Sequence, residues 1–152
     1  DYESNEEDLP THLIFSIYRS LTFYHADKHE DAARHLNHFL NTVSIKQYSH
    51  VHLEVKLLLA MEYAILNDFD LFQQLINSIQ RQFRLLGKDQ CARALMFSKM
   101  LKTAISEAKR DKPAKIQSLI DKYHTEPVRE GYSPIELLPL NQQFIDRLVG
   151  SL

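Results

Sequence analysis

Apolar residues recur three and four positions apart along most of the chain from Thr11 onward, and this spacing places side chains on one face of an α-helix. The first apolar stripe consists of Leu13, Ile14, Ile17, Leu21 and Tyr24. After a polar turn at 27–30, the second stripe consists of Ala32, Leu36, Phe39, Leu40 and Val43. The pattern therefore predicts two amphipathic helices joined by a short polar turn.

The third predicted helix, at about 49–66, is apolar over most of its surface. Its apolar residues include Leu53, Leu57, Leu58, Ala60, Met61, Ala64 and Ile65. Such a helix has to be covered on several sides, so we expect it to lie at the centre of the fold. A polar turn at 67–68 separates it from a fourth stripe, which consists of Phe72, Leu75, Ile76, Ile79, Phe83 and Leu86.

Two further stripes predict a fifth and a sixth helix. They consist of Ala94, Phe97, Leu101, Ala104, Ile105 and Ala108, and of Ile116, Leu119, Ile120 and Tyr123. Gly87 stands where a left-handed residue would end the fourth helix. We expect Ser49, Asp89 and Asp111 to cap the third, fifth and sixth helices with their side chains. Pro113 is tolerated in the first turn of the sixth helix, where its missing amide has no partner.

The helical pattern breaks at 124–132 and resumes at 133–136, where the sequence reads Ser-Pro-Ile-Glu. This segment predicts a capping box, in which Ser133 accepts a hydrogen bond from the third amide and Glu136 reaches back to the first. Pro139 interrupts the helix. A last amphipathic helix at 141–149 carries Phe144, Ile145, Leu148 and Val149.

The composition agrees with an all-α fold. The 152 residues include only 3 Gly and no Trp, and so few glycines cannot punctuate the many hairpins of a sheet or barrel. We divide the chain into an acidic tail or linker at 1–10, a helical domain at 11–124, and a C-terminal loop with capping helices at 125–152. Because the first residue is Asp1 rather than Met, we expect the chain to be a piece of a longer protein.

The polar turns within the helix pairs recur along the chain. The turns that begin at Asp27 and Asn67 are 40 residues apart, and the turn at Asp111 follows 44 residues later. At equal distances before these turns lie three small residues, Ser20, Ala60 and Ala104. A small residue at this position lets two helices approach closely, so the pattern predicts three similar helical hairpins.

This repeat resembles the tetratricopeptide (TPR) family, in which a small residue of helix A precedes the turn and an Ala follows in helix B. Phe23 and Tyr63 match a family aromatic residue, Phe69 matches the turn aromatic of the second unit, and Ala32 matches the helix B Ala of the first. The chain departs from the family in its period of about 40–44 rather than 34 residues. It also lacks the end-of-repeat Pro and the turn Gly. In place of that Gly stand Asp27, Asn67 and Asp111, residue types that tolerate the same backbone region at some cost.

The resemblance implies a right-handed array of about three antiparallel helix pairs, with C-terminal helices added, that binds a protein or peptide on its concave face. A plain bundle of helical hairpins is the alternative. The groove of a TPR-like array would include Ile17, Leu21, Tyr24, Leu57, Met61, Leu101 and Ile105. The alternative for these residues is that they belong to the core and are covered by the segment 125–152.

Histidine is frequent, with eight in the chain. Most of them stand in the pairs His25 and His29, His35 and His38, and His50 and His52. Zinc needs three or four converging ligands, and no HExxH, paired-Cys or EF-hand pattern is present, so we predict no metal site and no cofactor. Cys91 lies near a helix N-terminus, which lowers a thiol pKa, but the neighbouring Asp89 opposes this effect. We predict a buried Cys91 and a protein that is not an enzyme.

The net charge of −2 is unevenly distributed, because the segment 81–122 holds eleven bases and four acids. Its basic-face candidates are Lys99, Lys102, Lys109, Arg110, Lys112 and Lys115. We expect a non-catalytic protein–protein interaction or scaffolding module, with a protein or peptide as its partner. The alternatives are a nucleic-acid-associated module that uses the basic face and a metal-dependent enzyme. The chain has no apolar run long enough to span a membrane, and its single cysteine favours the cytoplasm.

Overall fold

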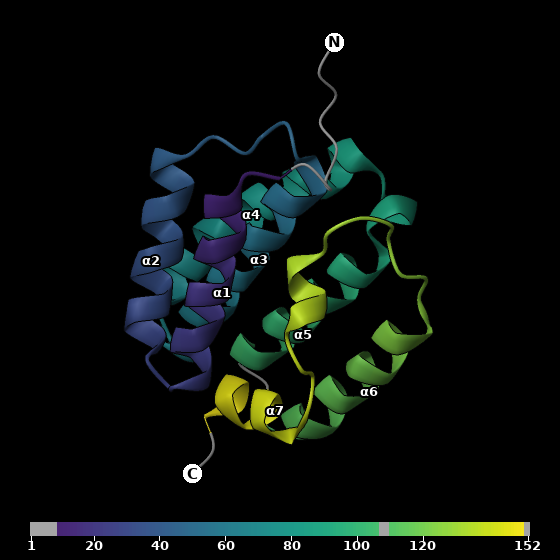
Figure 1. Ribbon diagram of the computed structural model, residues 1–152. Coiled ribbons are helices and arrows are strands. Elements are labelled where there is room, and N and C mark those ends of the chain that lie inside the picture. Colours follow the sequence, from purple (N-terminus) through teal and green to yellow (C-terminus); the bar gives the residue numbers. More distant parts are fainter. Residues whose placement is uncertain (1–8, 107–109, 151–152) are drawn as a thin grey trace.

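The fold is all-α, and no strand occurs in residues 9–106 and 110–150, which the computed structural model describes (Figure 1). The helices are α1 (Thr11–His25), α2 (His29–Thr42), α3 (Ser49–Ile65), α4 (Phe69–Leu86), α5 (Ala92–Ile105), α6 (Lys112–Thr125) and α7 (Gln142–Val149). Two short 3-10 helices, η2 (Lys88–Cys91) and η3 (Pro134–Leu137), lie in the connections. The prediction of an all-α fold from the hydrophobic period is confirmed.

Consecutive helices form three hairpins, α1–α2, α3–α4 and α5–α6, whose two members pack extensively against each other. The small residues Ser20, Ala60 and Ala104 are buried, in α1, α3 and α5 respectively. Their short side chains let the helices of each pair approach closely. Residues 1–8 of the acidic tail, residues 107–109 and residues 151–152 lie outside the described part of the chain.

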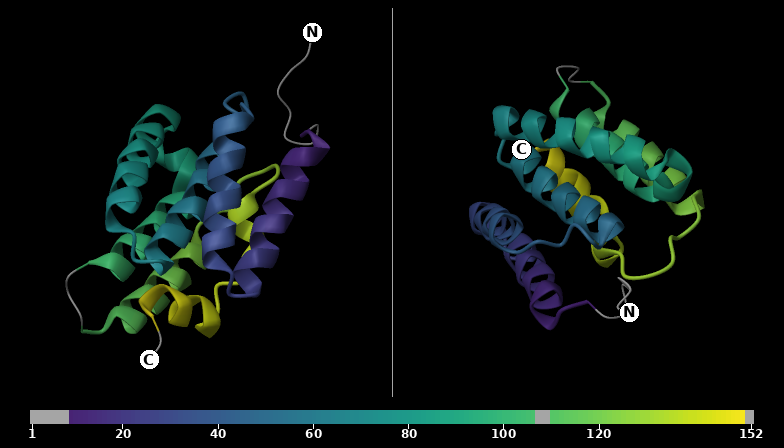
Figure 2. Two further views of the ribbon diagram at one scale, coloured as in Figure 1. Left: turned by 90° about the vertical axis from the view of Figure 1, so that its left-hand side faces the viewer. Right: turned by 90° about the horizontal axis from the view of Figure 1, so that it is seen from above.

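Helix α3 lies at the centre of the molecule. It contacts α2, α4 and α5 as well as η3 and α7, and every residue from Leu53 to Ala64 is buried. The view from above in Figure 2 shows α3 between the α1–α2 hairpin and α4. The central position expected from its wide apolar arc is therefore confirmed.

The turns of the three hairpins share a left-handed residue at the position expected from the sequence. Asp27, Asn67 and Asp111 have φ angles of 60°, 59° and 63°. In the first hairpin, the amides of Asp27 and Lys28 donate to the carbonyls of Tyr24 and Phe23 at 3.1 and 2.8 Å. This is the Schellman arrangement, which satisfies the last carbonyls of a helix. Residues with short polar side chains thus adopt the left-handed backbone conformation, for which glycine is the usual choice.

Several helix ends differ from the prediction. Gly87 ends α4 with a φ of 88°, as expected. Ser49, however, is the first residue of α3 rather than its cap, and the side chain of Asp111 makes no capping bond. Asp89 lies within the 3-10 helix η2, which precedes α5, and does not cap α5. The side chains that do cap are those of Asp68, which accepts from the Leu71 amide, and Asn141, which accepts from the Phe144 amide.

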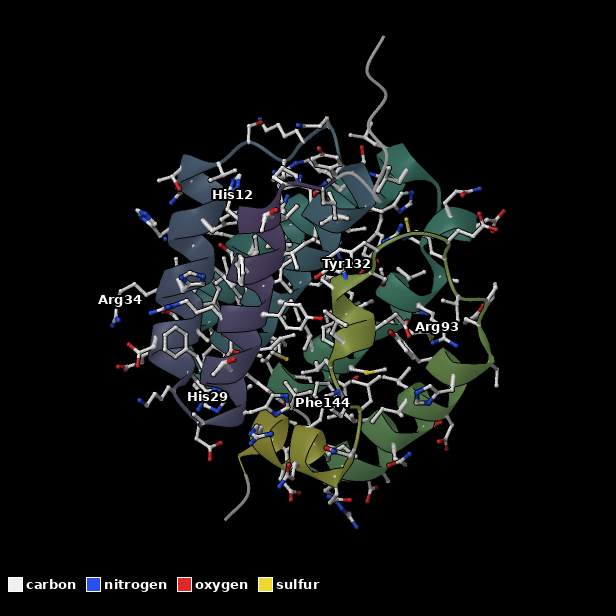
Figure 3. The ribbon with its side chains drawn as sticks, viewed as in Figure 1. His12, His29, Arg34, Arg93, Tyr132 and Phe144 are labelled. Carbon is white, nitrogen blue, oxygen red and sulfur yellow. The ribbon has the colours of Figure 1, made fainter. Side chains whose placement is uncertain are left out.

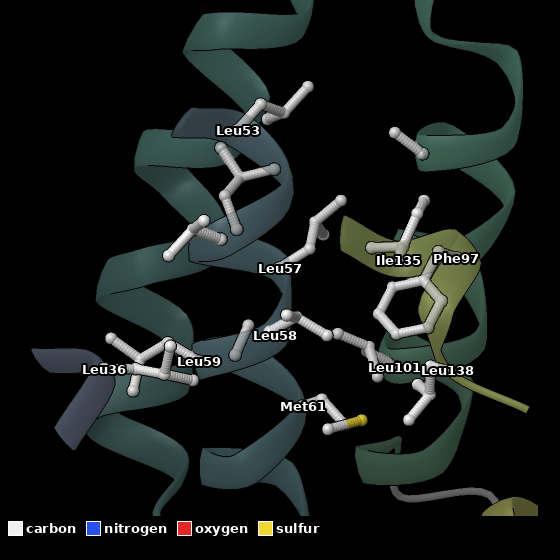
Figure 4. Packing of buried hydrophobic residues seen from close by; sticks show 14 of the residues in the cluster. Leu36, Leu53, Leu57, Leu58, Leu59, Met61, Phe97, Leu101, Ile135 and Leu138 are labelled. Carbon is white, nitrogen blue, oxygen red and sulfur yellow. The ribbon is translucent and has the colours of Figure 1, made fainter. Parts of the chain in front are cut away.

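The C-terminal segment folds back over α3 and α5. Its buried residues are Ile135, Leu138, Phe144, Ile145 and Leu148. Ile135 and Leu138 pack near Leu57, Phe97 and Leu101 (Figure 4), and the rings of Phe97 and Phe144 lie 5.9 Å apart. The segment therefore completes the core of the molecule.

Helices that combine the length and the apolarity needed to cross a membrane are absent from the described part of the chain.

Candidate functional site

The residues expected to line a partner groove lie in the interior. Buried side chains are those of Ile17, Leu21, Tyr24, Leu57, Met61 and Leu101, and Ile105 is partly buried against the same core. The expectation of an open groove with this lining is therefore wrong. For the residues of α3 and α5, the physical reason is that η3 and α7 contact α3, and α7 also contacts α5, so apolar side chains of the chain itself fill the space. The residues of α1 are on a helix that packs against α2.

The carboxylate of Glu54, 4% exposed on α3, anchors the C-terminal segment. It accepts hydrogen bonds from Ser133 Oγ at 2.6 Å, from the Ile135 amide at 3.2 Å and from Arg129 Nη2 at 3.1 Å. Burial raises the pKa of Glu54, and these donors partly offset the rise. Ser133 therefore bonds to α3 instead of closing a capping box.

Glu136, the other half of the predicted capping box, is also used across the fold. Its carboxylate accepts from Arg93 Nη1 at 3.0 Å and from Tyr123 Oη at 2.6 Å. The Arg93 guanidinium lies 4.8 Å from the centre of the Tyr123 ring and also donates to the Glu126 carbonyl. The capping-box prediction is wrong because two distant elements offer these side chains charge-assisted bonds.

A third polar contact joins α7 to the first hairpin. Arg147 Nε donates to Asp27 Oδ1 at 3.0 Å, and its guanidinium lies 4.5 Å from the centre of the Tyr24 ring. Beside it, His29 Nδ1 lies 2.8 Å from Oε1 of Glu62, which is 1% exposed. Burial raises the pKa of Glu62, and His29 opposes the rise. These contacts, like those of Glu54 and Glu136, join elements that lie far apart in the sequence.

The outward side of α1 carries two exposed aromatic residues. Phe15 is 69% exposed and Tyr18 is 53% exposed, and a spacing of three places both on one face. Arg19 is exposed beside them, with its guanidinium 5.5 Å from the centre of the Phe23 ring. We call Phe15, Tyr18 and Arg19 the α1 face. The segment Thr11–His25 contains no acidic residue, so this face is aromatic and cationic.

The α1 face continues toward the C-terminal segment. Burial raises the pKa of Tyr132 to about 12, and Tyr18 lies close enough to add to this rise. Figure 3 shows Tyr132 between α1 and η3. The other large exposed apolar residues are Phe69, Leu71, Leu85, Val128 and Leu137. They lie on α4, on η3 and in the loop before it, and not on α1.

The predicted basic-face residues are used unequally. Lys99, Arg110 and Lys115 are exposed, whereas Lys112 Nζ donates to the Ala104 carbonyl at 2.9 Å and so satisfies the end of α5. Burial, with a contribution from Lys99, lowers the pKa of Lys102. Lys109 lies outside the described residues.

A polar cluster between α3 and α4 was missed by the sequence analysis. Lys56 Nζ donates to Ser78 Oγ and Gln82 Oε1, and Gln82 Nε2 lies 3.2 Å from His52 Nδ1. We call His52, Lys56, Ser78 and Gln82 the α3–α4 polar cluster. The available signal was a charged residue, Lys56, inside the most apolar helix of the chain.

The α3–α4 polar cluster makes stability depend on pH. Burial, together with Lys56 and Lys46, lowers the pKa of His52 from 6.5 to about 4. The unfolded chain therefore binds more protons between these values, and the contribution of His52 to stability is lost as the pH falls from 6.5 toward 4. We expect His52→Gln to lessen the loss of unfolding free energy over this range by at most about 1.4 kcal/mol per pH unit.

Urea unfolding of both proteins at several pH values between 4 and 7 measures this difference. His38→Gln, which removes an exposed imidazole of α2, is the matched control. If the unfolding free energy fell equally steeply with decreasing pH for the wild type and for His52→Gln, the lowered pKa of His52 would be contradicted.

The remaining residues that could bind a metal ion or take part in catalysis do not lie together. Within residues 9–106 and 110–150, no three His, Cys, Asp or Glu side chains are placed to hold a metal ion. Cys91 is buried, and burial raises the pKa of its thiol. A pocket of about 430 Å³ is lined by Lys88, Asp89, Ala92, Leu95, Met96, Glu126 and Pro127. It brings together none of the predicted site residues.

The α1 face and the α3–α4 polar cluster are two features of the described structure that packing alone does not explain. The first exposes aromatic area to solvent, and the second buries an amine beside neutral acceptors. Comparison of the chain with protein family models, with curated proteins and with solved structures finds no match.

Proposed function

We infer that this protein is a non-catalytic interaction module that binds a partner protein through the α1 face. The observation that carries the inference is the exposure of Phe15 and Tyr18, at 69% and 53%, on a helix whose opposite side is buried. Aromatic residues and arginine are enriched among the residues that dominate binding energy at interfaces. Their side chains also lose little conformational entropy when a partner covers them.

The arrangement of hairpins supports the relationship to TPR-like arrays. Three helix pairs have a left-handed Asp or Asn at matching turn positions, which is what a diverged repeat without its turn glycine would contain. In such an array, η3 and α7 would occupy the side that the family uses for peptides. The outward side of α1 is then the surface left for a partner.

The charge of α1 favours an acidic, apolar partner segment. Helix α1 has no carboxylate, and Arg19 stands beside the two exposed aromatic residues. A partner with apolar side chains at helical spacing and flanking Asp or Glu residues would cover the rings and pair with the guanidinium. A basic partner would leave Arg19 facing a like charge.

Selection of a displayed library of random peptides on the purified protein tests this proposal. We expect the selected pool to be rich in acidic residues among spaced apolar ones. Phe15→Ala/Tyr18→Ala is expected to weaken binding of the pool by more than about tenfold, because truncation of dominant interface residues costs about 2 kcal/mol or more. Titration of a fluorescent pool peptide measures the affinity.

Leu85→Ala is the matched control, since Leu85 is 85% exposed on α4 and lies outside the α1 face. Phe15 and Tyr18 are exposed, so their truncation is expected to leave the thermal midpoint of unfolding nearly unchanged. A pool that binds Phe15→Ala/Tyr18→Ala as tightly as the wild type would overturn the proposal.

A further inference from the structure

Lys56 is a buried amine whose hydrogen-bond acceptors are neutral. The residue is 9% exposed on the central helix, and its ammonium donates to the Ser78 hydroxyl and the Gln82 amide oxygen. An ammonium carries three protons, so these two acceptors leave one donor unused. Buried cations are otherwise found paired with a carboxylate, because removal of the charge from water is costly.

The charges around Lys56 are also positive. Arg81 on α4 and Lys46 in the loop before α3 are exposed and lie close enough to act on it. Burial, Arg81 and Lys46 together lower the pKa of Lys56 to about 8. The same Lys46, with Lys56, acts on His52. Lys46, from the loop before α3, and Arg81, from the second half of α4, therefore both lie near Lys56 in the middle of α3.

The hydrogen bonds within the cluster occupy acceptor atoms of Gln82 and His52. Gln82 Oε1 accepts from Lys56, so Gln82 Nε2 donates to His52 Nδ1. The neutral imidazole then carries its proton on Nε2. Lys56 and Arg81 are donors with no acceptor atom, and N–H donors of cationic groups are what an oxyanion requires.

We propose that the α3–α4 polar cluster, flanked by Lys46 and Arg81, binds the phosphate group of a small molecule or inorganic phosphate. Phosphate has a double negative charge near neutral pH and several acceptor oxygens, which match two exposed cations and a buried ammonium. A guanidinium such as that of Arg81 pairs with two phosphate oxygens at once. The bound anion would supply the countercharge that the protein does not provide. This site is independent of the α1 face.

Calorimetric titration of the full chain with inorganic phosphate, at constant ionic strength set by potassium chloride, tests the proposal. Lys46→Gln/Arg81→Gln is expected to weaken phosphate binding by about tenfold or more, because each charge-assisted bond contributes about 1.5 kcal/mol or more. Both residues are exposed, so this variant is expected to fold. The matched control is Lys115→Gln/Lys122→Gln, which removes two exposed lysines of α6 and is expected to bind phosphate as the wild type does.

A second measurement follows Lys56 itself. Nuclear magnetic resonance titration of its ε-methylene group is expected to give a higher pKa at saturating phosphate than in chloride alone, because an anion stabilises the ammonium. An equal pKa in both solutions would overturn the proposal, as would unchanged phosphate affinity of Lys46→Gln/Arg81→Gln. Tighter binding of glycerol 3-phosphate than of inorganic phosphate would assign the site to a phosphate ester. The reverse order would assign it to free phosphate.

Discussion

Replacement of Glu54 by alanine should destabilise the protein by about 3–5 kcal/mol, because removal of one partner from a buried charged network leaves the other partners unsatisfied. The carboxylate accepts hydrogen bonds from Arg129, Ser133 and the Ile135 amide, which hold the C-terminal segment on α3. Without it, the amide and the guanidinium remain in the interior with fewer acceptors. Urea unfolding followed by circular dichroism measures the change in free energy of unfolding.

Two variants sharpen the test of this carboxylate. Glu54→Gln keeps the shape and one acceptor oxygen, so we expect a smaller loss than for alanine. Glu30→Ala removes an exposed acid of α2 and is expected to change stability by less than about 0.5 kcal/mol. If Glu54→Ala lowered the free energy of unfolding no more than Glu30→Ala does, the hydrogen bonds of Glu54 would not hold the C-terminal segment on α3.

Phe97→Ala should have a comparable effect, about 3–5 kcal/mol, because truncation of a fully buried aromatic residue removes apolar contacts and leaves a cavity. Phe97 is 0% exposed and its ring lies 5.9 Å from that of Phe144 on α7. Figure 4 shows Leu57, Leu101 and Ile135 in the same part of the core. The cavity would therefore open between α3, α5 and the C-terminal segment.

Phe69→Ala is the matched control, since Phe69 is 54% exposed at the start of α4. The same urea titration should give a difference below about 0.5 kcal/mol for this variant. If Phe97→Ala were as stable as Phe69→Ala, the C-terminal segment would not pack on α5 as described.

The role of the C-terminal segment does not follow from the sequence pattern. By the hydrophobic pattern alone, residues such as Leu57 and Leu101 could line a groove or belong to the core. Helical periodicity identifies which face of a helix is apolar, but not what covers that face. Only the position of Ile135, Leu138 and Phe144 against α3 and α5 decides it.

The capping box shows the same limit in a single tetrapeptide. Ser133 and Glu136 have the spacing for a local cap, yet they bond to Glu54, Arg93 and Tyr123. Along the chain, Arg93 is 43 residues from Glu136, and Glu54 is 79 residues from Ser133. A local pattern cannot anticipate a stronger acceptor or donor that tertiary packing brings to the same place.

The α3–α4 polar cluster depends on packing in the same way. Lys56 stood out as a charged residue in an apolar helix, but its partners Ser78 and Gln82 come from another helix. The exposure of Phe15 and Tyr18 is likewise a property of the edge position of α1. In the sequence, both belong to an ordinary amphipathic segment.

The sequence by itself determined the helices, their order and the left-handed turns at Asp27, Asn67 and Asp111. These features depend on hydrophobic period and backbone preferences within a few residues. The tertiary structure decided the burial of the predicted groove, the use of Ser133 and Glu136, and the assembly of the α3–α4 polar cluster. Each of these depends on contacts between residues far apart in the chain, for which hydrophobic period and local spacing contain no signal.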